Sequence, residues 1–165
     1  MQLIKAKIVL FLFLMIIWLG LTYPVTSDEL AAGAITALVI MLLPLGSTAV
    51  FREFRLTPKA IAYAIVYVIV FLFELVKSNL DVAFRVLAPQ LPINPGIVRV
   101  KTRLTSQLGR TLLANSITLT PGTITVETRG EDFFIHWINV QTEDTEAATR
   151  AIVTKFERYL EVIFG

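Results

Sequence analysis

The residues that could do chemistry in this chain are a hydroxyl cluster, a single histidine and one acid–base pair. Ser116 could supply a hydroxyl nucleophile, and His136 could act as its base. The sequence contains no GxSxG motif, and no acid stands at a recognisable spacing that would orient His136. A lone histidine in a strand is typical of a hydrogen-bonded structural residue. We therefore predict no catalytic residue and no enzyme, and a hydrolase built on Ser116 and His136 is a minor alternative.

Metal and phosphate sites are not predicted either. The chain has no cysteine and one histidine, which excludes thiolate metal sites and makes a zinc site depend on several carboxylates. The turn TPGT (120–123) lacks the repeated glycines and the lysine of a phosphate-binding loop. We expect no metal and no cofactor.

The stretch LLANSITLTPGTITV (112–126) predicts a structural joint from helix to strand. Its first part is the apolar end of a helix, and its last part is β-branched. Pro121 and Gly122 occupy the central positions that a type II turn favours. The polar side chains are expected to satisfy backbone groups around the turn. The joint comprises Asn115, Ser116, Thr118, Thr120, Pro121 and Gly122.

Composition places the N-terminal half in a membrane. Hydrophobic residues make up 55% of the chain and charged residues 17%, against about 25% charged in soluble domains. Apolar segments cover residues 8–27, 30–51 and 60–73, and Pro44 and Gly46 are expected to kink the second. The third is only about 21 Å long as a helix, which is short for a full crossing.

Basic residues predict the orientation of these segments. Lys5 and Lys7 place the N-terminus in the cytoplasm, and the acidic loop 26–29 then lies outside. A full crossing by the third segment would put residues 96–165 outside, yet the basic residues that follow it favour the inside. We predict a multi-pass protein of the cell membrane with a cytoplasmic C-terminal domain. Whether two or three segments span the membrane stays open.

Glu74 and Lys77 lie three residues apart at the end of the third segment, on one helical face and close enough to pair. A carboxylate at membrane depth needs a partner, because burying its charge is costly. One such pair is too little for a proton path, which requires a chain of relays. Two interpretations stay open: an intramembrane contact with another subunit, or a helix end where both side chains reach water.

The remaining sequence predicts a small α+β domain. A proline-rich linker (89–96) separates the membrane domain (1–88) from residues 97–165, whose patterns predict the order β-α-β-β-α. The fold class is thus an α+β membrane protein. In FFIHWINV (133–140) both strand faces are largely apolar, so we expect a partner or the membrane part to cover one of them. The predicted docking face is Phe133, Ile135 and Trp137.

Charge argues against a nucleic-acid partner. Residues 96–165 carry 8 basic and 8 acidic side chains, so the surplus of +2 belongs to the membrane half. A nucleic-acid-binding domain would carry a concentrated basic surface.

Several stretches resemble the E subunit of the multi-subunit Mrp-type Na⁺/H⁺ antiporters. The clearest are LLANSITLTPGTITVE (112–127) and FIHWINV (134–140), and ELVKSNLDVAFRVLAP (74–89) and INPGIVRVKTRL (93–104) are also similar. The similarity is strong over residues 60–141 and extends to the whole chain in layout. Glu74, Ser78 and Asn79 match an E-x-x-x-S-N pattern of that family.

The resemblance implies a non-catalytic structural or assembly component of a complex that exchanges Na⁺ or another monovalent cation for protons. Its expected partners are the other membrane subunits and the lipid bilayer. Glu74, Lys77, Ser78 and Asn79 become candidate polar or subunit contacts. A membrane-anchored module that senses a small ligand is the alternative from another functional class.

Overall fold

The computed structural model describes residues 2–43 and 53–165. Positions 44–52, including the expected kink at Pro44 and Gly46, lie outside the described residues. The chain divides into two compact units, Met1–Phe54 and Arg55–Gly165. The predicted division after residue 88 differs from this one, because the third apolar helix packs with the α+β part.

The first unit is a helical hairpin of α1 (Gln2–Leu21) and α2 (Ser27–Leu42). Thr26 caps α2 by accepting a hydrogen bond from the Glu29 backbone N–H at 3.3 Å. Small residues let the helices approach: a Cβ added at Gly33 would lie 2.6 Å from the Trp18 ring, and Ala37 is buried. Over Ile4–Leu21, α1 is long and apolar enough to cross a membrane.

The second unit begins with α3 (Pro58–Leu87), one continuous helix of 30 residues. Thr57 caps it by accepting a hydrogen bond from the Ala60 backbone N–H, and Pro58 stands in its first turn. The helix is about 45 Å long at 1.5 Å per residue. It thus runs well past Glu74, where the apolar sequence stops, and by length and composition it also could cross a membrane.

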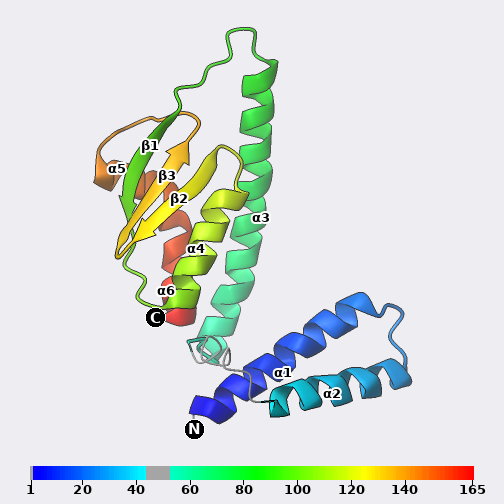
Figure 1. Cartoon of the computed structure of the whole chain (residues 1–165). Helices are drawn as coiled ribbons and strands as arrows, with labels where there is room; N and C mark the ends of the chain where they lie inside the picture. The colour runs from blue at the N-terminus through cyan, green and yellow to red at the C-terminus, as the bar shows by residue number, and fades with distance from the viewer. Residues whose placement is uncertain (1, 44–52) are drawn as a thin grey trace. The chain divides into compact units, whose positions relative to one another are not determined.

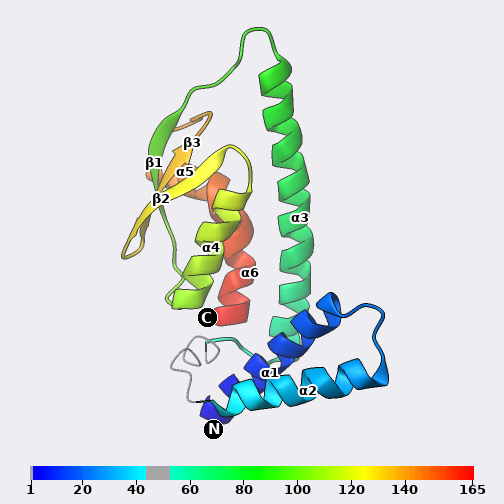
Figure 2. The same ribbon diagram turned by 45° about the vertical axis from the view of Figure 1, so that its right-hand side comes forward.

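The α+β part follows the predicted order, with the last helix divided in two. Its elements are β1 (Gly96–Lys101), α4 (Gln107–Leu119), β2 (Thr123–Arg129), β3 (Asp132–Trp137), α5 (Thr145–Ile152) and α6 (Thr154–Phe164). The strands form an antiparallel sheet in the order β1-β3-β2. Figures 1 and 2 show three layers in this unit: the sheet, then α4 and α6, then α3.

Local sequence explains where the helices of this unit begin. Ser106 accepts a hydrogen bond from the Gly109 backbone N–H at 2.9 Å and so caps α4. Asp144 does the same for α5 through the Ala147 backbone N–H at 2.8 Å.

The buried carboxylate of Glu157 on α6 accepts from the Thr102 hydroxyl (2.6 Å) and the Arg103 backbone N–H (2.7 Å), which holds the chain after β1 against α6.

The core lies between the sheet and the helices. Val98, Val100, Phe133 and Ile135 point from the strands into it, and Phe156 and Leu160 meet them from α6; all are buried. The predicted docking face is therefore wrong for Phe133 and Ile135, which are 0% exposed beneath the chain's own helices. Trp137, at the end of β3, is half-buried.

The opposite face of the sheet carries the exposed apolar residues. Ile97, Ile124 and Val126 are 63%, 53% and 57% exposed, and Ile97 and Ile124 flank His136 on β3. The two apolar faces of β3 thus differ in environment. The chain's own helices cover the face with Phe133 and Ile135, and the face with His136 lies on the exposed side of the sheet.

Phe133→Ala should lower the free energy of unfolding by about 3–5 kcal/mol, because it leaves a cavity in the core. Ile97→Ala, on the exposed face, should change it by no more than about 0.5 kcal/mol. Guanidinium unfolding of the full chain in detergent, followed by Trp137 fluorescence in a Trp18→Phe background, measures both. Equal effects of the two substitutions would contradict the assignment of the sheet faces.

Candidate functional site

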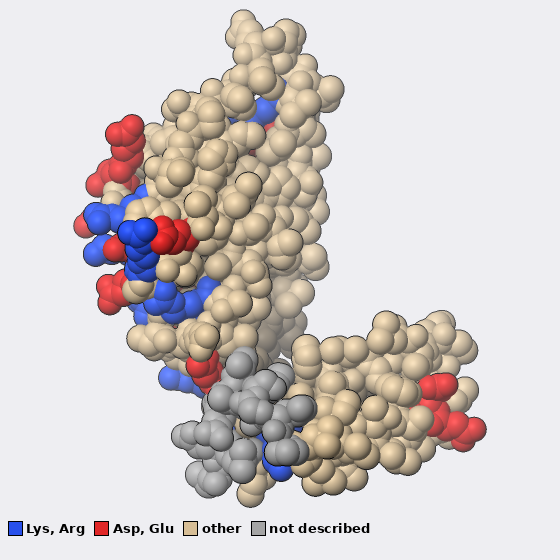
Figure 3. Space-filling model, viewed as in Figure 1, with Lys and Arg blue, Asp and Glu red and all other residues tan. Residues whose placement is uncertain are grey.

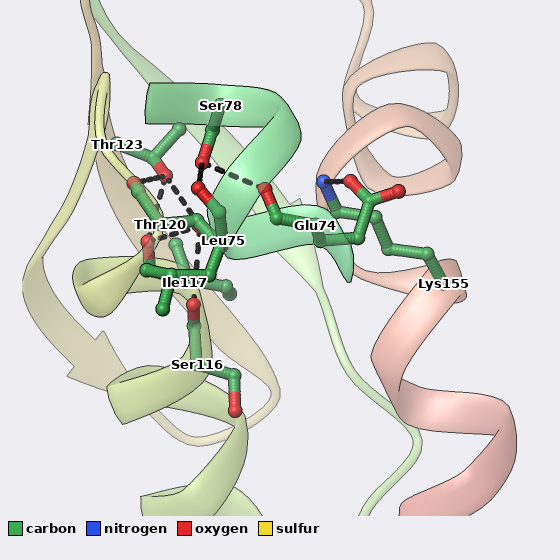
Figure 4. A network of polar contacts seen from close by, with 8 residues as sticks. All are labelled: Glu74, Leu75, Ser78, Ser116, Ile117, Thr120, Thr123 and Lys155. Carbon is green, nitrogen blue, oxygen red and sulfur yellow. Dashed lines mark hydrogen bonds and ion pairs between the residues drawn. The ribbon is translucent and has the colours of Figure 1, made fainter. Parts of the chain in front are cut away.

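Several of the predicted site residues meet at one place, where α3 crosses the joint between α4 and β2. We call this contact the α3 seam and define it by Tyr67, Glu74 and Ser78 on α3, the joint residues 116–123, and Lys155 on α6. Figure 4 shows its polar core. Ring contacts continue the packing toward the start of α3: Tyr63 lies 6.1 Å from Tyr159, and Phe71 lies 6.4 Å from Phe156, between ring centroids.

The joint forms a turn between α4 and β2. The Thr120 hydroxyl donates to the Ile117 carbonyl at 2.8 Å, and the Thr123 hydroxyl donates to the same carbonyl at 2.7 Å. These bonds satisfy the Ile117 carbonyl, which has no helical partner at the end of α4. The Thr118 hydroxyl accepts from the Thr125 backbone N–H at 3.1 Å. Asn115 is exposed and has no side-chain hydrogen bond among the described residues.

Gly122 brings the turn close to two other elements. Its φ of +92° suits the third position of a type II turn, which favours glycine. A Cβ at this position would lie 2.9 Å from Ile138 Cγ2 and 3.6 Å from Val82 Cγ2 on α3. The Ile138 backbone N–H donates to the Gly122 carbonyl at 2.8 Å. The turn therefore lies close to the residue that follows β3 and to α3.

Ser116 holds α3 to α4. The residue is 3% exposed, and its hydroxyl hydrogen-bonds to the Tyr67 hydroxyl and donates to the Leu112 carbonyl at 2.7 Å. His136 lies on the other face of the sheet, beside Ile97 and Ile124. The two residues considered as a nucleophile and its base are thus on opposite faces, and no Ser116–His136 pair forms.

Glu74 is paired, but with a different lysine from the one expected. Its carboxylate lies 2.7 Å from Lys155 Nζ on α6, and the two side chains are 16% and 33% exposed. Lys77 makes no ion pair within residues 2–43 and 53–165. Ser78 and Asn79 donate to carbonyls of their own helix, those of Glu74 and Leu75, both at 2.7 Å. The spacing of Glu74 and Lys77 permits a pair, but the longer-range contact with α6 forms instead.

A cavity of about 260 Å³ opens in the seam, below the roughly 300–1,000 Å³ of sites for drug-sized ligands. Three basic and two acidic side chains line it. Each acid is paired, Glu74 with Lys155 and Asp81 with Arg85 at 2.7 Å, which leaves Lys77 as the surplus charge. The other polar lining includes Trp137, Asn139 and Gln141. The cavity could accept a small polar or anionic group.

The face of α3 that points away from the seam is apolar. Its exposed large hydrophobic residues are Ile61, Ile65, Val66, Val68, Ile69, Leu72, Phe73, Val76, Leu80, Phe84, Val86 and Leu87. In Figure 3 the charged side chains of this unit gather over the strands, and the surface along α3 is largely uncharged. The second unit is thus amphipathic as a whole. We call the listed residues the apolar face of α3.

Gly122→Val should lower the free energy of unfolding by about 1–3 kcal/mol more than Gly130→Val does. Both glycines have a positive φ, but a Cβ at Gly130 meets no atom within 4 Å. The two variants therefore differ in the clash with Ile138, which only Gly122→Val creates, and in the φ at which the valine is placed. The unfolding midpoint and the amount of each variant in membranes measure it, and wild-type membrane levels of Gly122→Val would refute the role given to the joint.

Glu74→Gln and Lys155→Met should couple in a double-mutant cycle by about 1 kcal/mol, since the pair is mostly shielded from water. The same cycle with Lys77→Met in place of Lys155→Met should give no coupling above error. Unfolding free energies of the single and double variants measure both cycles. Coupling of Glu74 to Lys77 instead of Lys155 would contradict the seam described above.

Comparison with known proteins identifies relatives over nearly the whole chain. The model of the family described as Na⁺/H⁺ ion antiporter subunit (MNHE) matches residues 11–163. The Na⁺/H⁺ antiporter E subunit of Alkalihalophilus pseudofirmus is 30% identical, covering 92% of this chain and 94% of that protein. The Na⁺/H⁺ antiporter E subunit of Bacillus subtilis is 32% identical, covering 95% and 97%.

A solved structure shares the fold. A chain in the structure of the membrane-bound sulfane sulfur reductase, an archaeal respiratory membrane complex, is 44% identical, with a TM-score of 0.83 over 97% of this chain and 99% of that one. The predicted resemblance is confirmed by the family match and by the relatives named as antiporter E subunits. The chain belongs to the MNHE family of Na⁺/H⁺ ion antiporter subunits.

Proposed function

We propose that this chain is a non-catalytic structural subunit of a multi-subunit membrane complex that exchanges a monovalent cation for protons. The observation that carries the proposal is the family match over residues 11–163, supported by antiporter relatives that align over more than nine-tenths of the chain. The seam supports a structural role, because its hydroxyls and its Glu74–Lys155 pair bind elements of the same chain together.

We further propose that residues 55–165 lie on the cytoplasmic side and that α3 does not cross the bilayer. Along residues 63–74, α4 and α6 occupy one side of α3 through contacts with Tyr63, Tyr67, Phe71 and Glu74. A spanning α3 would draw these helices and their sheet into the hydrocarbon, which unpaired strand edges do not tolerate. With α1 and α2 crossing, the basic N-terminus and the α+β part come to the same side.

In this arrangement α3 is an interfacial helix. It carries the α+β part on one side and turns its apolar face toward lipid, as amphipathic helices do when they lie at the boundary of headgroups and acyl chains. The helix thereby serves as the platform that holds the α+β part at the membrane surface. This placement removes the conflict between a third crossing and the basic residues that follow it.

A second candidate assignment is a subunit of a respiratory membrane complex. The 44% identity and the TM-score of 0.83 to a chain of the sulfane sulfur reductase complex favour it. Both assignments give the chain the same structural role and differ in the catalytic partners. The ligand-sensing module, by contrast, would function without such partners.

Co-purification tests the assignment and separates the two complexes. With a C-terminal tag and mild detergent, we expect antiporter-type membrane subunits to be recovered with the chain. Additional recovery of redox subunits would favour the respiratory complex, and their absence would favour a separate antiporter. Recovery of the chain alone, under conditions where those subunits are expressed, would contradict the structural role and favour the sensing module.

The proposed sidedness can be tested with single cysteines, because the native chain has none. Asp28→Cys, in the first turn of α2, should react with an impermeant maleimide in intact cells. Glu143→Cys, in the loop before α5, should react only in inside-out vesicles. Both positions are exposed, so access to the reagent decides the result. Labelling of both cysteines from the same side would contradict the proposed topology.

A further inference from the structure

The cavity of the α3 seam has a surplus of hydrogen-bond donors and positive charge. Glu74 is neutralised by Lys155, and Asp81 is bound by two nitrogens of Arg85 at 2.7 and 3.1 Å. Lys77 is exposed and makes no ion pair or hydrogen bond among the described residues. The lining therefore has a net charge of +1 that no acid of this unit compensates.

Three neutral side chains of the lining also have unused donors. The side chains of Trp137, Asn139 and Gln141 make no hydrogen bond within the parts of the chain that the structure describes, and all three line the cavity. Their N–H groups and the Lys77 ammonium are suited to the oxygens of an anion. The cavity is too small for a drug-sized ligand but large enough to receive a headgroup-sized polar group.

Apolar surface begins one helical turn from this charge. Phe73 and Leu80, four residues before and three after Lys77, are 65% and 54% exposed, and Val76 is 59% exposed. Residues at these spacings are neighbours on a helix surface. A ligand held by Lys77 would thus have the apolar face of α3 beside it. Such a juxtaposition fits an amphiphile with an anionic head and apolar chains.

We propose that the cavity of the α3 seam binds the phosphate group of an anionic phospholipid, whose acyl chains lie along the apolar face of α3. The inference rests on the proposed interfacial placement of α3. That placement brings the boundary between α3 and the α+β part to the depth of the headgroups. The bound lipid satisfies the free donors and covers part of the apolar face of α3. It thereby fixes the α+β part against the membrane.

Lipid binding to the purified full chain tests the proposal by native mass spectrometry. The probes are phosphatidylglycerol and phosphatidylcholine with the same acyl chains, added to the chain in mild detergent. We expect phosphatidylglycerol to bind more tightly. Lys77→Gln should weaken its binding about five-fold, as expected for the loss of one basic side chain at an anionic membrane surface, and Lys77→Arg should retain it.

Lys101→Gln is the matched control, because it removes the same charge from an exposed lysine of β1 that does not line the cavity. An equal loss in Lys101→Gln would reveal nonspecific charge attraction and overturn the proposal. Equal binding of the two lipids would overturn it as well. Displacement of phosphatidylglycerol by millimolar inorganic phosphate would assign the cavity to a free anion and refute the lipid.

Failure of this inference is distinguishable from failure of the proposed function. Lys77→Gln changes a side chain with no ion-pair or hydrogen-bond partner among the described residues, so its unfolding midpoint should match that of the wild type. If the wild-type chain co-purifies with antiporter-type subunits but shows no preference for phosphatidylglycerol, only the lipid site is wrong. If it binds the lipid through Lys77 but is recovered without partners, only the assembly role is wrong.

Discussion

The packing of α3 against the α+β part is the contact on which the rest of the second unit depends. A helix as long and apolar as α3 would by itself be expected to span a bilayer. Here one side of α3 packs against α4 and α6 through two ring contacts, the Tyr67–Ser116 hydrogen bond and the Glu74–Lys155 ion pair. This packing determines which side of α3 remains exposed and apolar, where the seam lies, and which residues line its cavity.

Local patterns were sufficient to predict much of the α+β part. Residue patterns predicted the order of the strands and helices in this part, and the Pro121–Gly122 pair predicted the turn, where Gly122 has the positive φ that a type II turn favours at this position. These features depend on backbone preferences and hydrogen bonds within a few residues, so a single sequence contains the information needed.

Long-range features could not be predicted in the same way. The apolar pattern of the third segment ends at Glu74, but α3 continues to Leu87. The partner of the Glu74 carboxylate is Lys155, far along the chain, which local spacing could not identify. Both faces of β3 are apolar, so periodicity could not tell which one faces the core; the packing of the helices decides it, and Phe133 and Ile135 lie inside. The spacing of Tyr63, Tyr67, Phe71 and Glu74 did contain a signal, since it marks one side of α3.

The seam also gives a physical account of Glu74 that needs no ion path. A carboxylate beside so much apolar surface is costly unless its charge is compensated, and Lys155 compensates it from within the same unit. Lys77, one turn away, has no such compensation among the described residues and lies where the apolar face of α3 meets the cavity. The two residues that the sequence placed together as a pair therefore have different roles: Glu74 stabilises the fold, and Lys77 faces outward with a charge available to a ligand.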